Sequence, residues 1–430
     1  MKRLISTLLV FTFLIGVTGC NGQPVTSDPS FEVEKPPIEV QTLPEPEILE
    51  TRLDYLINDE IPEGNSSAII EESGEVGVTA YFDYTQKASI PLGFDINRNM
   101  ISLDAVSFNL ESIPPKGKKS ILAANIMGDR KRKVQCAVYE APYLVWAECP
   151  NAKNLPDSTN GADWAVYIMN IETEELTLID YDQGIRSGKG YQYPYLCPTK
   201  IAMCGNYIAY QSFAKNTGGI VVPVMKLYTI SNQTMLIIDE LKTDPTKNAI
   251  GYPSISGNLI AWPQGYVRPD GNYEGYCVLY DISTGIRKLI TSENVINPYL
   301  TKGYLIAVNH PNQNRNDSEI VVYDINKTAW LYKFNGTFSQ YADALYPTLE
   351  EPSSIGRYFT WRVTGSPALI VMDLKTGTRY TIIDKDDGHS VNYPILLNGH
   401  VLTWYEPEDT PNNGRIIHLY YYYLRENPID

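Results

Sequence analysis

The chain has 430 residues and a formal net charge of -15 at pH 7, with 35 Lys and Arg against 50 Asp and Glu. So acidic a chain is a poor candidate for a nucleic-acid-binding protein, because such proteins neutralise phosphates with Lys and Arg. Aromatic residues make up 11% of the chain, and tyrosine alone occurs 32 times. Aromatic side chains suit the half-buried surfaces of β-strands, so the composition favours β-structure.

The first residues are typical of a targeting sequence. Lys2 and Arg3 precede an apolar stretch, residues 4–17, that is too short for a convincing membrane span. The sequence VTGC, which ends at Cys20, resembles the lipobox of bacterial lipoproteins. The resemblance implies a signal peptide over residues 1–19, lipid attachment to Cys20 and an extracytoplasmic location at a membrane. An ordinary signal peptide with a chance cysteine is the alternative.

Residues 20–50 differ in composition from the rest of the chain. Prolines alternate with glutamates, and such a segment cannot bury a core. Pro-rich chains are extended, at about 3.1 Å per residue. We therefore expect a stalk between the lipid and a globular domain that covers residues 51–430.

Four cysteines form two close pairs along the predicted strands. Cys136 and Cys149 flank one strand pair, and Cys197 and Cys204 flank another. An exported protein can keep disulfides, so each pair could link its own hairpin. Small buried thiols are the alternative. No spacing of Cys and His indicates zinc, and we expect no metal site of this kind.

A short phrase recurs along the chain. It reads CGNYIAY up to Tyr210, SGNLIAW up to Trp262, IGRYFTW up to Trp361 and NGHVLTW up to Trp404. A second phrase of β-branched and aromatic residues follows each time, as in VLYDISTGIRKLI from Val278. The period is near 50 residues, which indicates an array of repeats.

Each repeat predicts four antiparallel strands, here called A to D, joined by tight turns between A and B and between C and D. Units of this size are the blades of an all-β propeller. The last repeat lacks strand D, because little chain follows its strand C. Residues 51–59 resemble the strand D phrase at residues 378–386, so we expect residues 52–57 to close the ring by supplying this N-terminal strand.

The remaining N-terminal part sets the number of blades. Residues 67–125 are then expected to form an atypical first blade, with ESGEVGVTAYF as its strands A and B. This gives a propeller of seven four-stranded blades. If residues 51–120 instead form a separate β module, the propeller has six blades.

The phrases P-x-I-x-G-N-x-I-A-W and V-x-Y-D-I-x-T-G resemble the TolB-type, WD40-like propeller repeats of exported bacterial and archaeal surface proteins. The resemblance covers residues 120–424. It implies binding or scaffold roles, with occasional fusion to peptidase or lyase chemistry. It transfers no catalytic residue, because the matching motifs are structural. The tryptophan at the end of strand B is expected to pack between blades.

Loop lengths predict which face binds a ligand. The A–B and C–D turns are short, whereas the B–C and D–A connections are long and polar, as in PQGYVRPDGNYEG. Long loops on a rigid scaffold usually carry binding residues. We call the end of the ring that carries the B–C and D–A connections the loop face. The candidate ligand-binding residues there are Tyr266, Arg268, Tyr273, Tyr191, Tyr193, Tyr341 and His389. For Tyr252, in the Tyr-Pro before a strand A, packing against the next blade is the preferred interpretation.

Other chemistry has weaker support. The loops DKDDGH at residues 384–389, NQNRND at 312–317 and DSTNGAD at 157–163 are rich in oxygen ligands, so calcium is possible, but solvated turns are favoured. No nucleophile elbow, HExxH motif or phosphate-binding loop is present, and no other cofactor is expected.

The sequence therefore predicts a lipid-anchored, extracytoplasmic propeller that binds a protein or glycan of the cell envelope without catalysis. Its expected partners are the membrane, through the lipid, and this envelope ligand; nucleic acid is not expected. An envelope polysaccharide lyase or glycosidase is one alternative, because carboxylates from distant loops could pair across a ring. An envelope assembly scaffold is another.

Overall fold

The structure is a computed structural model of the whole chain. It describes residues 38–40, 47–49, 56–57, 60–82, 89–104, 107, 109–114, 118–123, 132–150, 164–181, 197–215, 219, 221–241, 248–267, 273–290, 295–309, 319–335, 349–363, 368–383, 392–397, 400–409 and 415–425. Cys20 and the calcium-like loops lie outside these ranges. Within them, no helix has the length and apolarity that crossing a bilayer requires.

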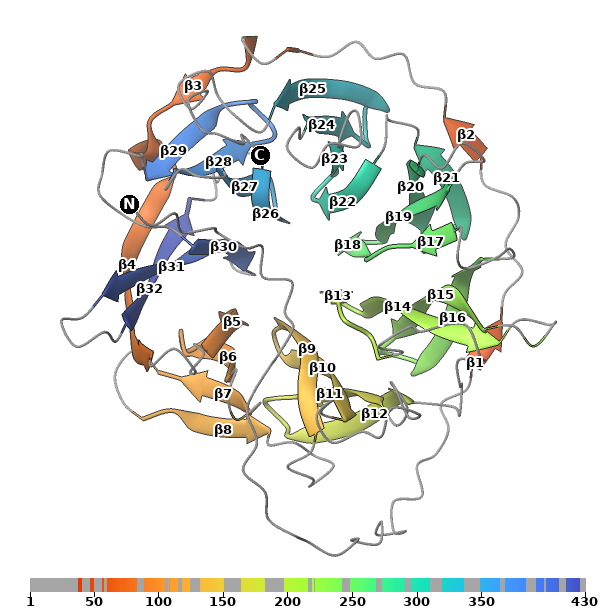
Figure 1. Cartoon of the computed structure of the whole chain (residues 1–430), viewed down its shortest axis with the longest axis horizontal. Helices are drawn as coiled ribbons and strands as arrows, with labels where there is room; N and C mark the ends of the chain where they lie inside the picture. Colours follow the sequence, from red (N-terminus) through yellow and green to blue (C-terminus); the bar gives the residue numbers. More distant parts are fainter. Residues whose placement is uncertain are drawn as a thin grey trace, which may run out of the picture. The chain divides into compact units, whose positions relative to one another are not determined.

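Seven four-stranded antiparallel sheets form a ring, as Figure 1 shows, so the seven-blade prediction is confirmed. Blade 1 contains β5 (Ser89–Phe94), β6 (Met100–Asp104), β7 (Leu110–Ile113) and β8 (Ser120–Ala123). Blade 2 contains β9 (Arg132–Glu140), β10 (Tyr143–Pro150), β11 (Ala165–Asn170) and β12 (Glu175–Tyr181). Blade 3 contains β13 (Ile201–Cys204), β14 (Tyr207–Lys215), β15 (Val221–Thr229) and β16 (Thr234–Glu240).

The remaining blades repeat this order, with strand A innermost and strand D outermost. Blade 4 contains β17 (Asn248–Ile250) and β18 (Ser254–Ser256), which share the inner position, β19 (Leu259–Val267), β20 (Tyr273–Asp281) and β21 (Ile286–Ile290). Blade 5 contains β22 (Val295–Thr301), β23 (Tyr304–Asn309), β24 (Glu319–Asp324) and β25 (Ala329–Asn335). Blade 6 contains β26 (Leu349–Ile355), β27 (Tyr358–Val363), β28 (Leu369–Asp373) and β29 (Arg379–Ile383).

Blade 7 takes its outer strand from the start of the chain. It contains β30 (Asn392–Leu397), β31 (Val401–Asp409), β32 (Arg415–Leu424) and then β4 (Ile70–Phe82), which pairs antiparallel with β32. An N-terminal strand therefore closes the ring, as the sequence predicted. The segment is different, because residues 52–57 do not supply the strand.

The misassignment of β4 has a physical reason. The sequence ESGEVGVTAYF looked like two strands and a turn because of its glycines, but it is part of one continuous strand. Gly74 lies opposite Tyr421 of β32, and a Cβ atom on Gly74 would come within 2.8 Å of the Tyr421 hydroxyl. This glycine thus makes room for an aromatic ring on the neighbouring strand.

Large aromatic side chains fill the spaces between blades. The tryptophans expected at the end of strand B lie within that strand, because each strand B continues beyond them. All four, Trp146, Trp262, Trp361 and Trp404, are at most 2% exposed. Trp262, for example, packs against Met225 and Leu227 of blade 3. This confirms the expected packing role, and replacing so large a buried aromatic by alanine typically costs about 3–5 kcal/mol.

Buried ion pairs add a polar link between blades. Lys226 of β15 lies 2.7 Å from the Asp180 carboxylate of β12, which also accepts a 2.8 Å hydrogen bond from the Tyr210 hydroxyl. In the next interface, Asp239 of β16 pairs with Arg287 of β21 at 2.7 Å and accepts a hydrogen bond from the Trp262 indole. An outer-strand aspartate thus connects its blade to the following one in both places.

The segment before β4 runs along the outer strands of four successive blades. β1 (Ile38–Val40) pairs in parallel with β16, β2 (Glu47–Leu49) with β21, and β3 (Glu63–Gly64) with β29. Between β2 and β3, Leu56 lies opposite Tyr332 of β25 in a parallel bridge: its N–H donates to the Leu331 carbonyl at 2.8 Å, and its carbonyl accepts from the Lys333 N–H at 2.9 Å. We call these four paired segments the strap; β1, β2 and β3 lie outside the ring in Figure 1. A 3₁₀ turn, η2 (Ser66–Ala68), then leads into β4.

The strap was not predicted from the sequence. Two of its segments, β1 and β2, fall within residues 20–50, for which a stalk is expected. Residues 20–37 of that stalk lie outside the described residues. The resemblance of residues 51–59 to a strand D phrase was misleading, since Leu56 lies beside an existing outer strand instead of replacing a missing one.

A histidine at the closing sheet makes ring stability depend on pH. His418 of β32 contacts Glu75 of β4 at 2.8 Å through Nδ1 and Glu408 of β31 at 2.9 Å through Nε2. These hydrogen bonds raise the pKa of His418 above its ordinary 6.5. The added stability is therefore fully present below pH 6.5 and is lost as pH rises through the raised pKa of the folded state.

We predict that His418→Gln destabilises the protein mainly at the lower pH values, where the wild-type imidazole is protonated. Urea denaturation of wild type and variant between about pH 6 and pH 9 measures the difference in unfolding free energy, which shrinks as the imidazolium of the wild type loses its proton. A difference that stays constant across this range contradicts the role of the charged histidine.

A second prediction concerns the buried pair between blades 2 and 3. Lys226→Met leaves the Asp180 carboxylate buried without its cation, and we expect the free energy of unfolding to fall by about 3–5 kcal/mol. The double variant Lys226→Met/Asp180→Asn removes the charge but keeps an acceptor for the Tyr210 hydroxyl, so it recovers much of the loss. Denaturant titration measures the free energy of unfolding of both variants. A loss below about 1 kcal/mol for Lys226→Met contradicts the prediction.

Candidate functional site

The loop face carries hairpins that are longer than expected. Tyr266 and Tyr273 were predicted to lie in the middle of a loop, but Tyr266 belongs to β19, opposite Glu274, and Tyr273 begins β20, opposite Val267. The predicted long loop is wrong here, because strand pairing satisfies the backbone groups that a loop would leave to water. The hairpins of blades 3 and 7 also extend, to Lys215 opposite Val221 and to Asp409 opposite Arg415.

The other five sequence-predicted binding residues are not among the described residues. They are Arg268, Tyr191, Tyr193, Tyr341 and His389. Their role at the loop face stays a prediction.

In the structure no disulfide joins Cys136 to Cys149 or Cys197 to Cys204, so neither of the two suggested disulfides is formed in it. Cys136 lies opposite Ala147 in the β9–β10 pair, whereas Cys149 lies opposite Lys133. Each thiol has a contact elsewhere; Cys136, for example, lies 3.3 Å from the Pro198 carbonyl of the next blade. Burial raises the pKa of the Cys136 thiol to about 12, which makes it a poor nucleophile.

Exposed and polar side chains meet at the inner strands of blades 3, 4 and 5. The Thr199 hydroxyl donates a 3.0 Å hydrogen bond to the Tyr252 hydroxyl of blade 4. The ammonium of Lys200, the next residue, lies 5.7 Å from the ring centroid of Tyr299 in blade 5. We call Thr199, Lys200, Tyr252 and Tyr299 the inner cluster. It joins three successive blades beside the axis of the ring.

Local structure positions each member. Thr199 and Lys200 end the D–A connection before β13, and Tyr252 occupies the break between β17 and β18. Pro253, which follows Tyr252, lacks an N–H, and a strand tolerates such a residue only where that donor is not needed. Tyr299 lies within β22, opposite Ile306 of β23.

Tyr252 corrects one interpretation of the sequence. Packing against the next blade was preferred for this residue, but its side chain is 43% exposed and its polar contact is with the preceding blade. Lys200 and Tyr252 occupy equivalent positions in their repeats, because Lys200 precedes Tyr210 by the same number of residues as Tyr252 precedes Trp262. This equivalence explains why both side chains lie at the inner strands. Comparing this position between repeats would have identified both residues as neighbours at the ring axis.

The electrostatics of the inner cluster centre on Lys200. Its side chain reaches solvent, yet the surrounding inner strands exclude much of the water, and this desolvation lowers the pKa of its ammonium. Among the described residues, no carboxylate forms an ion pair with Lys200. Desolvation also raises the pKa of Tyr299, whose ring faces the lysine. The cluster therefore presents one cation with aromatic and hydroxyl neighbours.

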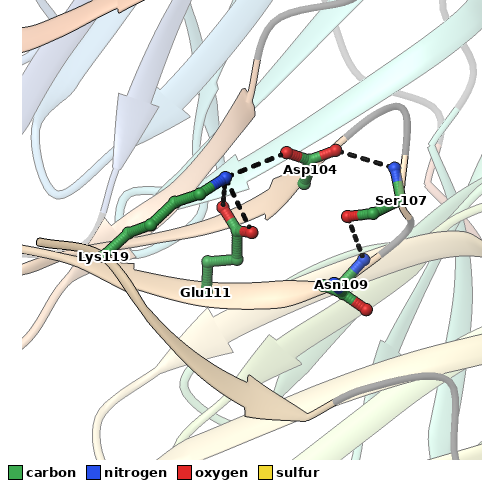
Figure 2. Close-up of polar contacts among 5 residues, drawn as sticks. All are labelled: Asp104, Ser107, Asn109, Glu111 and Lys119. Atoms are coloured by element: carbon green, nitrogen blue, oxygen red, sulfur yellow. Dashed lines mark hydrogen bonds and ion pairs between the residues drawn. The ribbon is translucent and has the colours of Figure 1, made fainter.

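A second polar cluster lies in blade 1 and has a structural role. Figure 2 shows Lys119 between Asp104 and the buried Glu111, with its Nζ at 3.4 Å from Asp104 and 3.0 Å from Glu111. Asp104 also accepts the backbone N–H of Ser107 at 2.8 Å. Burial raises the pKa of Glu111, and Lys119 opposes that rise. Because Lys119 forms ion pairs with both carboxylates, we interpret Asp104 and Glu111 as residues that stabilise this small sheet and not as an acid–base pair.

Metal binding finds no support in the part of the chain that the structure describes. No group of three or more His, Cys, Asp or Glu side chains there could hold a metal ion. The three calcium-like loops lie outside that part.

Comparison with protein-family models and with curated protein sequences gives no match. Solved structures share the fold. TolB from Acinetobacter baumannii is 13% identical, with a TM-score of 0.34 over 71% of this chain and 63% of its own. The uncharacterized protein lmo1340 from Listeria monocytogenes EGD-e is 11% identical, with a TM-score of 0.45 over 73% and 88%. The β-propeller domain of the Trilobed protease from Pyrococcus furiosus is 8% identical, with a TM-score of 0.44 over 81% and 94%.

The sheet topology defines the class of this protein by fold. Other structural neighbours are peptidases and an oligogalacturonate lyase. The chain spans less than two thirds of the TolB chain that it matches. At such low identities the likeness shows the fold alone: the protein is a seven-bladed β-propeller similar to TolB.

The inner cluster makes a prediction about lysine reactivity. Lys200 should titrate below the ordinary lysine value of 10.5, because desolvation disfavours its charged form. Competitive acetylation of the full chain at a series of pH values, followed by peptide mass spectrometry, gives the pKa of this amine. Lys375, exposed in the C–D turn of blade 6, serves as the internal reference for the reaction. A Lys200 titration at or above 10.5 contradicts the prediction.

Proposed function

We propose that the protein is a lipid-anchored, extracytoplasmic β-propeller that binds a protein or glycan of the cell envelope through its loop face, without catalysing a reaction. The inner cluster is the observation that carries this proposal. Thr199, Lys200, Tyr252 and Tyr299 come from three blades, and Tyr252 and Lys200 remain exposed. The sequence VTGC, ending at Cys20, supports the lipid anchor.

The chemistry of the cluster favours an anionic group on the ligand. Lys200 has no ion-pair partner among the described residues, so a carboxylate or a phosphate group would give its ammonium a counter-charge. The partly desolvated surroundings strengthen such a pair relative to bulk water. The ring of Tyr252 offers an apolar face and a hydroxyl, which suit a sugar ring or a peptide side chain.

The scaffold favours binding over chemistry. The cluster rests on paired inner strands that are held by buried side chains, so a ligand finds its contacts already arranged and the cost of ordering them is small. The described residues of the cluster include no carboxylate pair that could act as acid and base. A lysine that is held by an aromatic ring and a hydrogen-bonded tyrosine can orient an anion without transferring a proton.

We predict that the double variant Lys200→Met/Tyr252→Ala captures its envelope ligand at least about tenfold less efficiently than wild type, a loss of about 1.4 kcal/mol. Chemical cross-linking of the full chain in membranes, with identification of the captured protein or glycan, measures this. Ile96→Asn provides the control, because Ile96 is 89% exposed in the A–B turn of blade 1, at the opposite end from the loop face.

Tyr266→Ala/Tyr273→Ala tests whether the blade 4 hairpin contributes to the same contact. Equal capture by wild type and by the Lys200→Met/Tyr252→Ala variant contradicts the proposed site. Release of cut glycan by wild type alone contradicts the non-catalytic function.

A further inference from the structure

The outer strands of this propeller accept additional strands in parallel. Four of them, β16, β21, β25 and β29, already pair with the strap. The outer edge of a sheet exposes unpaired N–H and C=O groups, and an extended segment can satisfy them. The strap therefore shows which kind of partner these edges take: a short, extended segment that runs parallel to strand D.

The position of β1 on blade 3 can be mapped onto blade 2 through the strand register. In blade 3, Tyr210 pairs with Lys226 and Lys226 with Ile237, the last of the three residues opposite β1. In blade 2, Trp146 pairs with Tyr167 and Tyr167 with Leu178. Leu178 of β12 thus corresponds to Ile237 of β16. Residues 176–178 of β12 form the same edge position on the blade next to the one that carries β1.

This edge of β12 is open in the part of the chain that the structure describes. β12 is the outermost strand of its sheet there, with β11 as its neighbour. Leu176 is 43% exposed, whereas the corresponding Met235 under the strap is fully buried. β8 of blade 1 and β4 of blade 7 are outermost as well. β8 has only four residues, and β4 comes from the other end of the chain and pairs with β32 across two register shifts. β12 is therefore the longer of the two open outer strands that belong to their own repeat.

Charge indicates what a strand on β12 would carry. Two of the three acidic residues in the paired segments of the strap meet a basic residue: Glu47 lies opposite Lys288 in the register, and Glu63 pairs with Arg379 at 2.5 Å, whereas Glu39 lies opposite Leu236. β12 has the opposite character, because Glu174 and Glu175 are exposed at its start, next to the exposed Glu172. An acidic segment like those of the strap would be repelled, and a basic one attracted.

We propose that the outer edge of β12 is a strand-acceptor site for an extended, basic segment of a partner polypeptide. The segment adds in parallel beside residues 176–178, places an aliphatic side chain over Leu176 and brings Lys or Arg to Glu174 and Glu175. Backbone hydrogen bonds provide the attachment, and the acidic side chains select the partner. This surface lies on the outer rim and is distinct from the inner cluster, so the strand-acceptor proposal does not depend on the proposed function.

The test uses the full chain in detergent and a fluorescent peptide, acetyl-KIKVK-amide. We expect saturable binding that weakens with salt, and protection of β12 amides from hydrogen exchange. The same peptide with N-methylated backbone nitrogens should bind at least about tenfold more weakly, because it cannot complete a ladder. The acidic peptide acetyl-EIEVE-amide should also bind more weakly.

Two matched substitutions locate the site on the protein. Leu176→Lys should weaken binding at least about tenfold, since an edge lysine disfavours strand addition and repels a basic peptide. Ile286→Lys should leave it unchanged, because Ile286 has nearly the same exposure, 45% against 43%, on the outer strand that already carries β2.

Several outcomes overturn the proposal. The proposal is wrong if the basic peptide does not bind, or if the N-methylated peptide binds as tightly as the unmodified one. It is also wrong if Leu176→Lys and Ile286→Lys change the affinity for the peptide equally. Protection of β16 instead of β12 would show that the peptide displaces the strap. A dimer in light scattering that Leu176→Lys dissociates would show that a second copy of the chain occupies the edge.

Discussion

The antiparallel pairing of β4 with β32 determines whether the seven blades form a ring. Each of the other blades is completed by strands that are consecutive in the chain, but blade 7 needs a strand from the beginning of the chain. The pairs extend from Arg415 opposite Phe82 to Leu424 opposite Ile70, so the two ends of the domain are joined along a whole strand. Aromatic packing between blades 7 and 1, with Phe94 against Tyr421, completes the seam. Without this strand, blade 7 would expose its strand C.

The candidate site depends on that closure. The inner cluster combines side chains from three blades, and their distances are set by how tightly successive blades pack. Buried tryptophans and the Asp180–Lys226 and Asp239–Arg287 pairs fix the angles between neighbours. A closed ring prevents those angles from relaxing, because every blade has a neighbour on both sides. Lys200 is thereby held beside Tyr299, at the cost of part of its hydration.

Periodic features of the sequence predicted the fold well. The strand B tryptophans, the glycine turns and the recurring strand C phrase give the number of strands in each blade and their order, because neighbouring blades impose the same packing on each repeat. The closing strand was harder to find. Gly74 looks like a turn residue in sequence, and only the ring of Tyr421 on the opposite strand explains it. The strap is equally hard to see, because parallel pairing of three residues requires no hydrophobic pattern.

The site was predicted less well than the fold. Tyr266 and Tyr273 drew attention because they lie between predicted strands, but strand pairing continues through both. Lys200 has no motif around it, and its significance arises from Tyr252 and Tyr299, which are distant in sequence and adjacent in the ring.

Closure of the ring by β4 is the claim on which this arrangement rests, and hydrogen–deuterium exchange of the full chain tests it most directly. The account predicts that the amides of β4 exchange as slowly as those of β32 and become exposed together with them on global unfolding. Fast, independent exchange of β4 while β32 stays protected would contradict it.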